Sequence, residues 1–204
     1  MKYLTPNTLV VFALKSEIMP FFKEIKIQNE WRLADIPLLY QADIKGIPLF
    51  LLKTGVGSSN VEKAFTLLPT FLDISKIINI GTCGTLTQQV TLYDTVFPEK
   101  FISMKDSKAF FLQQCPKDAA CGLTCLTLDK FLKAGDFSSE LFQKRYSADL
   151  LDMEAWDVVK WAKKKSLDVL VIKCVSDLVG VNFHKTVKKN IPLCAHHLAQ
   201  VLLS

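Results

Sequence analysis

Residues 151–162, LDMEAWDVVKWA, and residues 169–177, VLVIKCVSD, decide the fold class of this chain. From position 155 onward, apolar residues in the first stretch recur at the i, i+3, i+4, i+7 spacing, which predicts one buried face of a helix. The second stretch is short, apolar and β-branched, which is typical of a strand buried on both faces. A helix followed directly by such a strand indicates an α/β fold.

The rest of the chain repeats this alternation of buried strands and helices. We predict further strands at residues 9–14, 31–34, 38–44, 48–53, 77–80, 94–97 and 123–128, and helices from about residue 18, over 61–72 and over 185–203. Residues 103–120 lack a clear period and are expected at the surface. The pattern predicts a single α/β domain over residues 1–204, with a central mixed β-sheet flanked by helices.

Composition excludes several classes of function. The chain has 204 residues, half of them hydrophobic, and a formal net charge of +5. Arg32 and Arg145 are its only arginines, and nucleic-acid readout would favour arginine with interleaved aromatic residues, so we expect no nucleic-acid partner. No apolar run approaches the roughly 20 residues that span a bilayer, so we expect no membrane partner. We interpret residues 9–14 as the first strand rather than part of a signal peptide, and expect a cytoplasmic protein.

The cysteines give no indication of a metal site. Six are scattered along the chain without a CxxC pair, at positions 83, 115, 121, 125, 174 and 194. In a cytoplasmic protein such cysteines are expected to be reduced and structural. The sequence therefore predicts no metal ion.

Three acids and three glycine-rich turns mark the junctions between strands and helices. Glu17, Glu154 and Asp177 each border an apolar segment, and we predict glycine turns at residues 55–57, at residues 81–84 and after Asp177. Each feature alone has an ordinary explanation, as a helix-terminal carboxylate, an Asx turn or a simple turn glycine. Together, at the carboxyl ends of strands, they favour a ligand site. Neither GxGxxG nor GxxxxGK[ST] occurs, so nothing supports a dinucleotide site or a P-loop.

The order of these motifs resembles the purine nucleoside phosphorylase/uridine phosphorylase superfamily, and within it the methylthioadenosine/S-adenosylhomocysteine nucleosidases. The resemblance rests on residues 11–17, 51–57, 78–84, 129–132, 152–155 and 175–177, of which the last two segments are the most specific. It implies a nucleoside phosphorylase-like fold, a small-molecule purine nucleoside as substrate, no cofactor and a homodimer.

The resemblance also implies the roles of individual residues. Asp177 would protonate purine N7 and Glu17 would orient or deprotonate the attacking water. Glu154 would bind the ribose hydroxyls and Phe131 would stack on the base. The full set of implied substrate-binding residues is Val56, Thr82, Cys83, Gly84, Phe131, Leu132, Asp152, Met153, Glu154, Lys173, Ser176 and Phe183.

Departures from the family pattern affect the substrate more than the reaction. Lys173 stands where the nucleosidases usually carry arginine, and Asp152 stands where glutamate is commoner. The region 101–126 is shorter and lacks the segment that in nucleosidases reaches the neighbouring subunit's site. The superfamily's phosphorylases hold phosphate with several arginines near the first glycine loops. Here Glu17 would repel phosphate at the first-strand turn, so water is the better nucleophile.

We therefore expect a hydrolase that cleaves the N-glycosidic bond of 5′-methylthioadenosine or S-adenosylhomocysteine. The first alternative is a nucleoside phosphorylase or another nucleosidase, such as a futalosine hydrolase. The second is a non-catalytic nucleoside-binding or storage protein on the same fold, against which the joint presence of the three acids argues.

Overall fold

The computed structural model describes residues 1–106, 108–113, 116, 121–129, 139–179 and 183–204, with the backbone alone at 139, 141 and 183–185. The strands are β1 (Thr8–Phe12), β2 (Lys26–Arg32), β3 (Leu38–Ile44), β4 (Ile47–Lys53), β5 (Lys76–Thr85), β6 (Thr95–Val96), β7 (Lys100–Ser103), β8 (Ala109–Phe111), β9 (Thr124–Thr127), β10 (Leu150–Asp152) and β11 (Asp168–Leu178). The helices are η1 (Lys15–Glu17), α1 (Met19–Phe22), α2 (Ser58–Thr66), α3 (Ser139–Tyr146), α4 (Ala155–Lys164) and α5 (Phe183–Leu203).

The strands form one mixed sheet with β5 at its centre. Their order is β2-β3-β4-β1-β5-β10-β9-β7-β8, and β11 pairs with β5 and with β6. β5 pairs in parallel with β1 along its first half and with β11 along its whole length, and its end turns antiparallel to β10. The carboxyl ends of β1, β5 and β11 therefore meet at one edge of the sheet, where ligands bind in open α/β folds.

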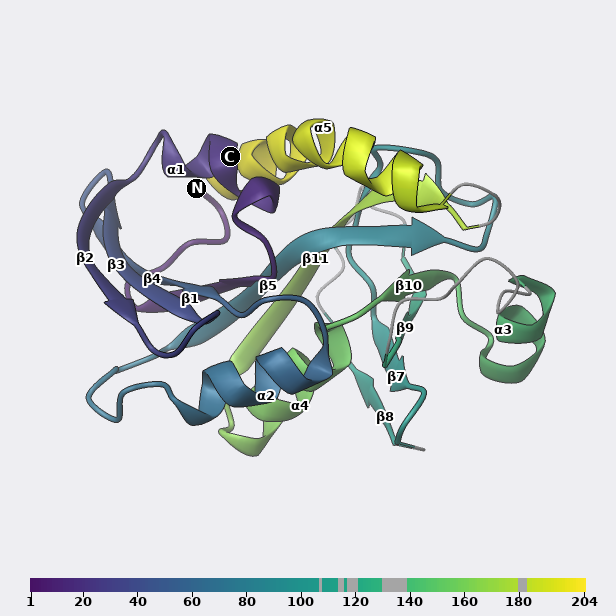
Figure 1. Cartoon of the computed structure of the whole chain (residues 1–204), viewed down its shortest axis with the longest axis horizontal. Coiled ribbons are helices and arrows are strands. Elements are labelled where there is room, and N and C mark those ends of the chain that lie inside the picture. Colours follow the sequence, from purple (N-terminus) through teal and green to yellow (C-terminus); the bar gives the residue numbers. More distant parts are fainter. Residues whose placement is uncertain (107, 114–115, 117–120, 130–138, 180–182) are drawn as a thin grey trace.

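Helices cover both faces of this sheet, as Figure 1 shows, with α5 and α1 on one side and α2 and α4 on the other. Two hydrophobic clusters fill the two interfaces, and a third lies beside β9 and β10. None of the described helices is long and apolar enough to cross a membrane. This arrangement is the predicted α/β architecture of a mixed central sheet flanked by helices.

Local sequence explains the main elements. Every residue of β1, TLVVF, is buried, as expected for a strand covered on both faces. In α4, Ala155, Val158, Val159 and Ala162 are buried, so the predicted helical face is confirmed. The buried residues of α5 include Cys194, Leu198 and Leu202, which recur at a helical spacing.

The predicted turn at residues 81–84 is wrong, and Asp177 does not lie past the end of its strand as expected. The turn predicted after Asp177 extends to Gly180, which lies outside the described residues. β5 continues as a strand through Thr85, and Asp177 lies inside β11 rather than past its end. The reason is that each strand supplies the other's hydrogen-bonding partner as far as the pairing of Leu178 with Thr85. Glycine within a strand marks a close approach of neighbouring groups here, rather than a turn.

Several other elements also differ from the prediction. The strand expected near residues 31–34 is β2, whose residues are almost all exposed and so carry little hydrophobic signal. Residues 109–111, expected to be irregular, form β8 through pairing with β7. The helix expected at 61–72 is the shorter α2, and α3 and β10 were not predicted.

Truncating Leu198 tests the packing of α5 on the sheet. Its side chain is fully buried, and we expect Leu198→Ala to lower the free energy of unfolding by about 2–5 kcal/mol because it leaves a cavity. Leu193→Ala on the same helix is the control, since Leu193 is half exposed and should cost less than about 0.5 kcal/mol. Urea unfolding measures both, and equal losses would contradict this packing.

Candidate active site

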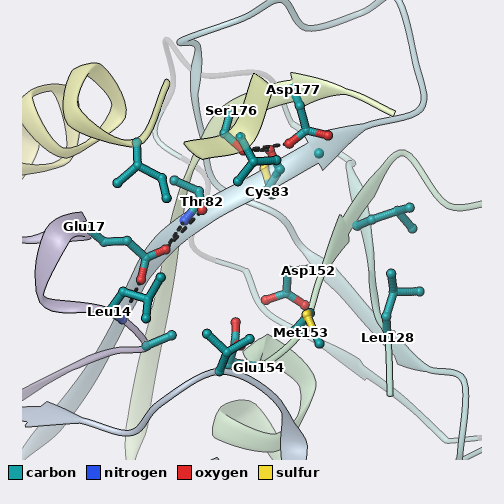
Figure 2. Close-up of a pocket in the computed structure, with 16 residues that line it drawn as sticks. Leu14, Glu17, Thr82, Cys83, Leu128, Asp152, Met153, Glu154, Ser176 and Asp177 are labelled. Atoms are coloured by element: carbon teal, nitrogen blue, oxygen red, sulfur yellow. Dashed lines mark hydrogen bonds between the residues drawn. The ribbon is translucent and has the colours of Figure 1, made fainter. Parts of the chain in front are cut away.

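A pocket opens at the edge of the sheet where β1, β5 and β11 end, and its interior, including the open mouth, measures about 640 Å³. It is lined by Ala13, Leu14, Glu17, Val56, Thr82, Cys83, Gly84, Leu128, Leu151, Asp152, Met153, Glu154, Ser176, Asp177, Val187 and Ile191. Figure 2 shows Ser176 and Asp177 on one side and Glu154 on the other, with Asp152 and Met153 between them. A mostly apolar cavity with a few convergent polar groups is typical of a small-molecule site.

The Asp177 carboxyl group is buried and only half satisfied. Its Oδ1 accepts a hydrogen bond from the Ser176 hydroxyl at 2.7 Å, whereas Oδ2 is buried and has no partner among the described residues. Burial raises the pKa of Asp177 to about 6, against a smaller lowering by the Ser176 hydroxyl. The carboxyl group is therefore tuned towards its neutral form, in which it can donate a proton.

Two features of the backbone bring Asp177 to this position. The β5–β11 register shifts between Val175 and Asp177, so Ser176 is the extra residue of a β-bulge, a device that re-aims side chains beside active sites. Across the ladder, a Cβ placed on Gly84 would lie 2.7 Å from Asp177 Oδ2. Only glycine at this position leaves room for the carboxyl group.

Glu17 follows β1 and is held by three donors. Its Oε2 accepts the Leu14 backbone N–H at 2.9 Å. Its Oε1 accepts both the backbone N–H of Thr82, at 2.9 Å, and the Thr82 hydroxyl, at 3.0 Å. These hydrogen bonds fix the position of the carboxyl group at the pocket edge. Thr82, which lies within β5, therefore fixes Glu17.

A buried ion pair lies behind the pocket wall. Lys173 Nζ is 2.8 Å from Asp152 Oδ2, and neither side chain is exposed by more than 1%. Asp152 also accepts hydrogen bonds from the Thr127 hydroxyl at 2.7 Å and the Ala155 backbone N–H at 2.8 Å. Burial would lower the pKa of Lys173, but the carboxylates of Asp152 and Glu154 outweigh it and raise that pKa above its usual range.

Glu154 occupies the N-cap position of α4 and faces the pocket. Its Oε1 accepts the Gly57 backbone N–H at 2.7 Å, an approach for which Gly57 adopts a φ of +95°. Burial and then the neighbouring Asp152 raise the pKa of Glu154 to about 8, against the lowering effect of Lys173. No described residue donates to Oε2, which leaves that oxygen for a ligand.

The structure gathers most of the predicted site residues around this one pocket. Those that line it are Glu17, Val56, Thr82, Cys83, Gly84, Asp152, Met153, Glu154, Ser176 and Asp177. Lys173 does not line it but contacts Asp152 from behind. Phe131 and Leu132 lie outside the described residues, as does the side chain of Phe183.

Sequence reasoning found Val56 and Met153 but missed other apolar residues of the lining. Val187 and Ile191 of α5 and Leu128 and Leu151 beside β9 and β10 all face the pocket. Val187 and Ile191 are four residues apart, so the sequence could predict that they share a helix face. It could not predict that this face lies against the pocket.

The cysteines carry little of the chemistry. Cys83, Cys125, Cys174 and Cys194 are free and buried, and burial raises the pKa of the pocket-lining Cys83 thiol well above its usual value. Cys121 is disulfide-bonded, so the expectation of reduced cysteines does not hold for it. Among the described residues, no group of three His, Cys, Asp or Glu side chains is placed to hold a metal ion.

Several known proteins that resemble this chain in sequence or structure are nucleosidases. The chain is 20% identical, over 93% of its length and 94% of the relative, to the 5′-methylthioadenosine/S-adenosylhomocysteine nucleosidase of Baumannia cicadellinicola. The corresponding enzyme of Colwellia psychrerythraea, solved in complex with adenine, superposes with a TM-score of 0.82 at 14% identity, covering 98% of this chain and 93% of that one. The futalosine hydrolase of Helicobacter pylori gives a TM-score of 0.81 at 13% identity, covering 97% and 96%.

These likenesses in structure establish the shared fold. The family model of the phosphorylase superfamily matches residues 10–135, more than half of the sequence. The match includes the first two glycine segments and Glu17. The chain therefore belongs to the phosphorylase superfamily.

Proposed function

We propose that this protein hydrolyses the N-glycosidic bond of a purine nucleoside of the 5′-methylthioadenosine or S-adenosylhomocysteine type. The observation that carries the proposal is the buried Asp177 carboxyl group, whose Oδ2 has no described partner and whose pKa is raised, at the wall of a pocket that also holds Glu17 and Glu154. A neutral carboxylic acid with a free oxygen is suited to protonating a leaving group.

The reaction separates a purine from a ribosyl carbon. The C1′–N9 bond breaks as Asp177 transfers its proton to N7, so that the base leaves without a negative charge. Water oxygen bonds to C1′, and its proton passes by way of Glu17 to solvent, where it balances the one that Asp177 lost. General acid catalysis of this kind contributes about 10²–10⁴-fold to the rate.

Glu154 is assigned to the ribose. Its Oε1 is fixed by Gly57, and its Oε2 is free to bond the 2′- and 3′-hydroxyls, with Met153 packing on the sugar. We assign Phe131, Leu132 and Phe183 to the base and the substrate tail from the family resemblance alone.

The environment of Glu17 favours water over phosphate as the nucleophile. Glu17 is 5% exposed and is held at the pocket edge by three hydrogen bonds, and a carboxylate at this place would repel phosphate. No lysine or arginine is among the residues that line the pocket in the described part of the chain. Phosphate sites in proteins commonly contain such cations. This observation argues against phosphorolysis.

The relatives and the apolar lining support a thioether tail on the substrate. The curated relatives carry the name 5′-methylthioadenosine/S-adenosylhomocysteine nucleosidase. Val187, Ile191 and Leu14 supply the apolar surface that such a tail needs. The futalosine hydrolase among the structural neighbours keeps other purine nucleosides as the second candidate class. We further propose a cytoplasmic location and a homodimer.

Base release tests the proposal directly. Purified protein is incubated with 5′-methylthioadenosine, S-adenosylhomocysteine, adenosine and inosine, each with and without phosphate, and the free base is measured. We expect adenine from the two thioethers without phosphate. Release that requires phosphate would identify a phosphorylase. Folded protein that releases no base from these four compounds would indicate a different nucleoside substrate or a non-catalytic nucleoside-binding protein.

Removing the Asp177 proton donor should stop turnover. Asp177→Asn keeps the shape of the side chain, and we expect kcat to fall by about 10²–10⁴-fold because the leaving purine is no longer protonated. Equilibrium binding of an uncleaved nucleoside analogue to the variant is the control for an intact pocket. Retained turnover would contradict the assignment of Asp177 as the acid.

The raised pKa of Asp177 also predicts a pH-dependent stability. An acid with a raised pKa binds its proton more tightly in the folded state, so its stabilising contribution is present at low pH and is lost as pH rises through about 6. Asp177→Asn lacks this loss. The free energy of unfolding of Asp177→Asn minus that of the wild type should therefore be about 2 kcal/mol higher at about pH 8 than at about pH 4. Urea unfolding at both pH values measures this difference, and a constant difference would contradict the shift.

A further inference from the structure

The β-bulge in β11 frees a backbone carbonyl next to the catalytic acid. Ser176 is the extra residue between the pairs Val175–Cys83 and Asp177–Gly84, so its carbonyl lies outside the regular ladder. A buried carbonyl without a partner is costly. Here the partner is a side chain, because Asn190 Nδ2 of α5 donates to Ser176 O at 2.7 Å.

Asn190 is a buried amide in an otherwise apolar helix face. It is 4% exposed, close to Cys194 and Leu198 on the same helix, which are fully buried. Packing alone would favour an apolar residue at such a position, since an amide must be desolvated. The amide is tolerated because both of its ends are satisfied. Its oxygen accepts a hydrogen bond from the Tyr93 hydroxyl at 2.9 Å.

Tyr93 fixes the orientation of this amide. Ser176 O can only accept, so it requires the NH₂ end of Asn190, and the Tyr93 hydroxyl then donates to the oxygen end. Tyr93 itself has a φ of +71°, which is uncommon for a bulky residue. Its backbone N–H donates to Val175 O at 2.8 Å. The Tyr93 backbone therefore binds β11 at Val175, the residue before the bulge. Its side chain orients the Asn190 amide, which binds the bulge itself.

Asn190 also connects the bulge to the wall of the pocket. Its helix neighbours Val187 and Ile191 line the cavity, while Asn190 bonds the residue that precedes Asp177. In the sequence of α5, the polar Asn190 therefore lies between Val187 and Ile191, the two apolar residues that line the pocket. Strained backbone and buried polar groups of this kind cluster at functional sites because the surrounding structure must hold a special geometry.

We infer that Asn190, oriented by Tyr93, is a positioning residue that holds the bulge at Ser176 and so aims the Asp177 carboxyl group at the leaving base. Asn190 does not touch the substrate. This inference rests on the proposed function, since it assumes that Asp177 protonates the base. The anchoring of the bulge can, however, be measured without turnover, so it can be tested independently of the proposed function.

The experiment compares Asn190→Leu and Tyr93→Phe with Leu198→Ala. Asn190→Leu removes both hydrogen bonds at similar volume, and Tyr93→Phe removes only the orienting hydroxyl while keeping the ring. Leu198→Ala is the matched control, because it weakens the packing of the same helix without touching the bulge. If Asn190→Leu fails to fold, Tyr93→Phe carries the test alone.

The first measurement is amide hydrogen exchange in residues 175–178. We expect both bulge variants to exchange faster there than the wild type by about tenfold or more, because local opening no longer breaks the anchoring bonds. For each variant the change in the free energy of unfolding, measured in urea, is subtracted before the rates are compared. The control should then leave this segment within about twofold of the wild type. Unchanged exchange in both variants would overturn the inference, whether or not the protein is an enzyme.

The second measurement uses two leaving groups. One substrate is 5′-methylthioadenosine, which needs protonation at N7, and the other is its N7-methylated analogue, which leaves without a proton. We expect the bulge variants to lose about tenfold or more in kcat on the first and less than about threefold on the second, with KM little changed. An equal loss on both substrates would indicate a general structural role and overturn the positioning claim. A wild-type protein inactive on both would instead refute the proposed function, leaving hydrogen exchange to decide whether Asn190 holds the bulge.

Discussion

The ion pair between Lys173 and Asp152 is the interaction on which the site depends. The pocket concentrates carboxyl groups from separate elements, and burying so much negative charge is unfavourable unless a cation and hydrogen-bond donors accompany it. Lys173 is that cation in the described part of the chain, and it is itself fully buried, 2.8 Å from Asp152. One ammonium group cannot neutralise every carboxylate around it. The remaining repulsion appears as the raised pKa of Glu154, to which Asp152 contributes after burial.

The same constraint separates the roles of Glu17 and Asp177. Glu17 accepts hydrogen bonds from Leu14 and Thr82 on both of its oxygens, which fix the orientation of its carboxyl group. Asp177 has a single donor, Ser176, and an oxygen without a partner, so burial dominates and its pKa rises. Two carboxyl groups in one pocket thus become a candidate base and a candidate acid through their surroundings. A hydrolysis of the kind proposed needs both at the same pH.

Local pattern predicted the elements that are buried and periodic, and it failed where pairing between distant strands decides the structure. The face of α4 could be predicted because helix periodicity is a property of neighbouring residues. The glycines at 81 and 84 suggest a turn when considered alone. They lie in a strand because β11 pairs alongside them and because Asp177 needs the space beside Gly84. The acids were predictable as residue types at junctions, whereas the bulge that aims Asp177 and the amide of Asn190 that supports it depend on tertiary register.

The last helix, α5, both lines the pocket and binds the segment that carries Asp177, and only a few residues separate it from that segment. Residues 178–182 separate Asp177 from the beginning of α5, so the helix must start close to the acid. Within two turns it supplies Val187 and Ile191 to the pocket and Asn190 to the Ser176 carbonyl. A ligand that presses on the apolar wall therefore acts on the same rigid element that holds the bulge. Because α5 is packed against the sheet by Cys194, Leu198 and Leu202, the hydrophobic core fixes the position of the wall and, through Asn190, that of the proton donor.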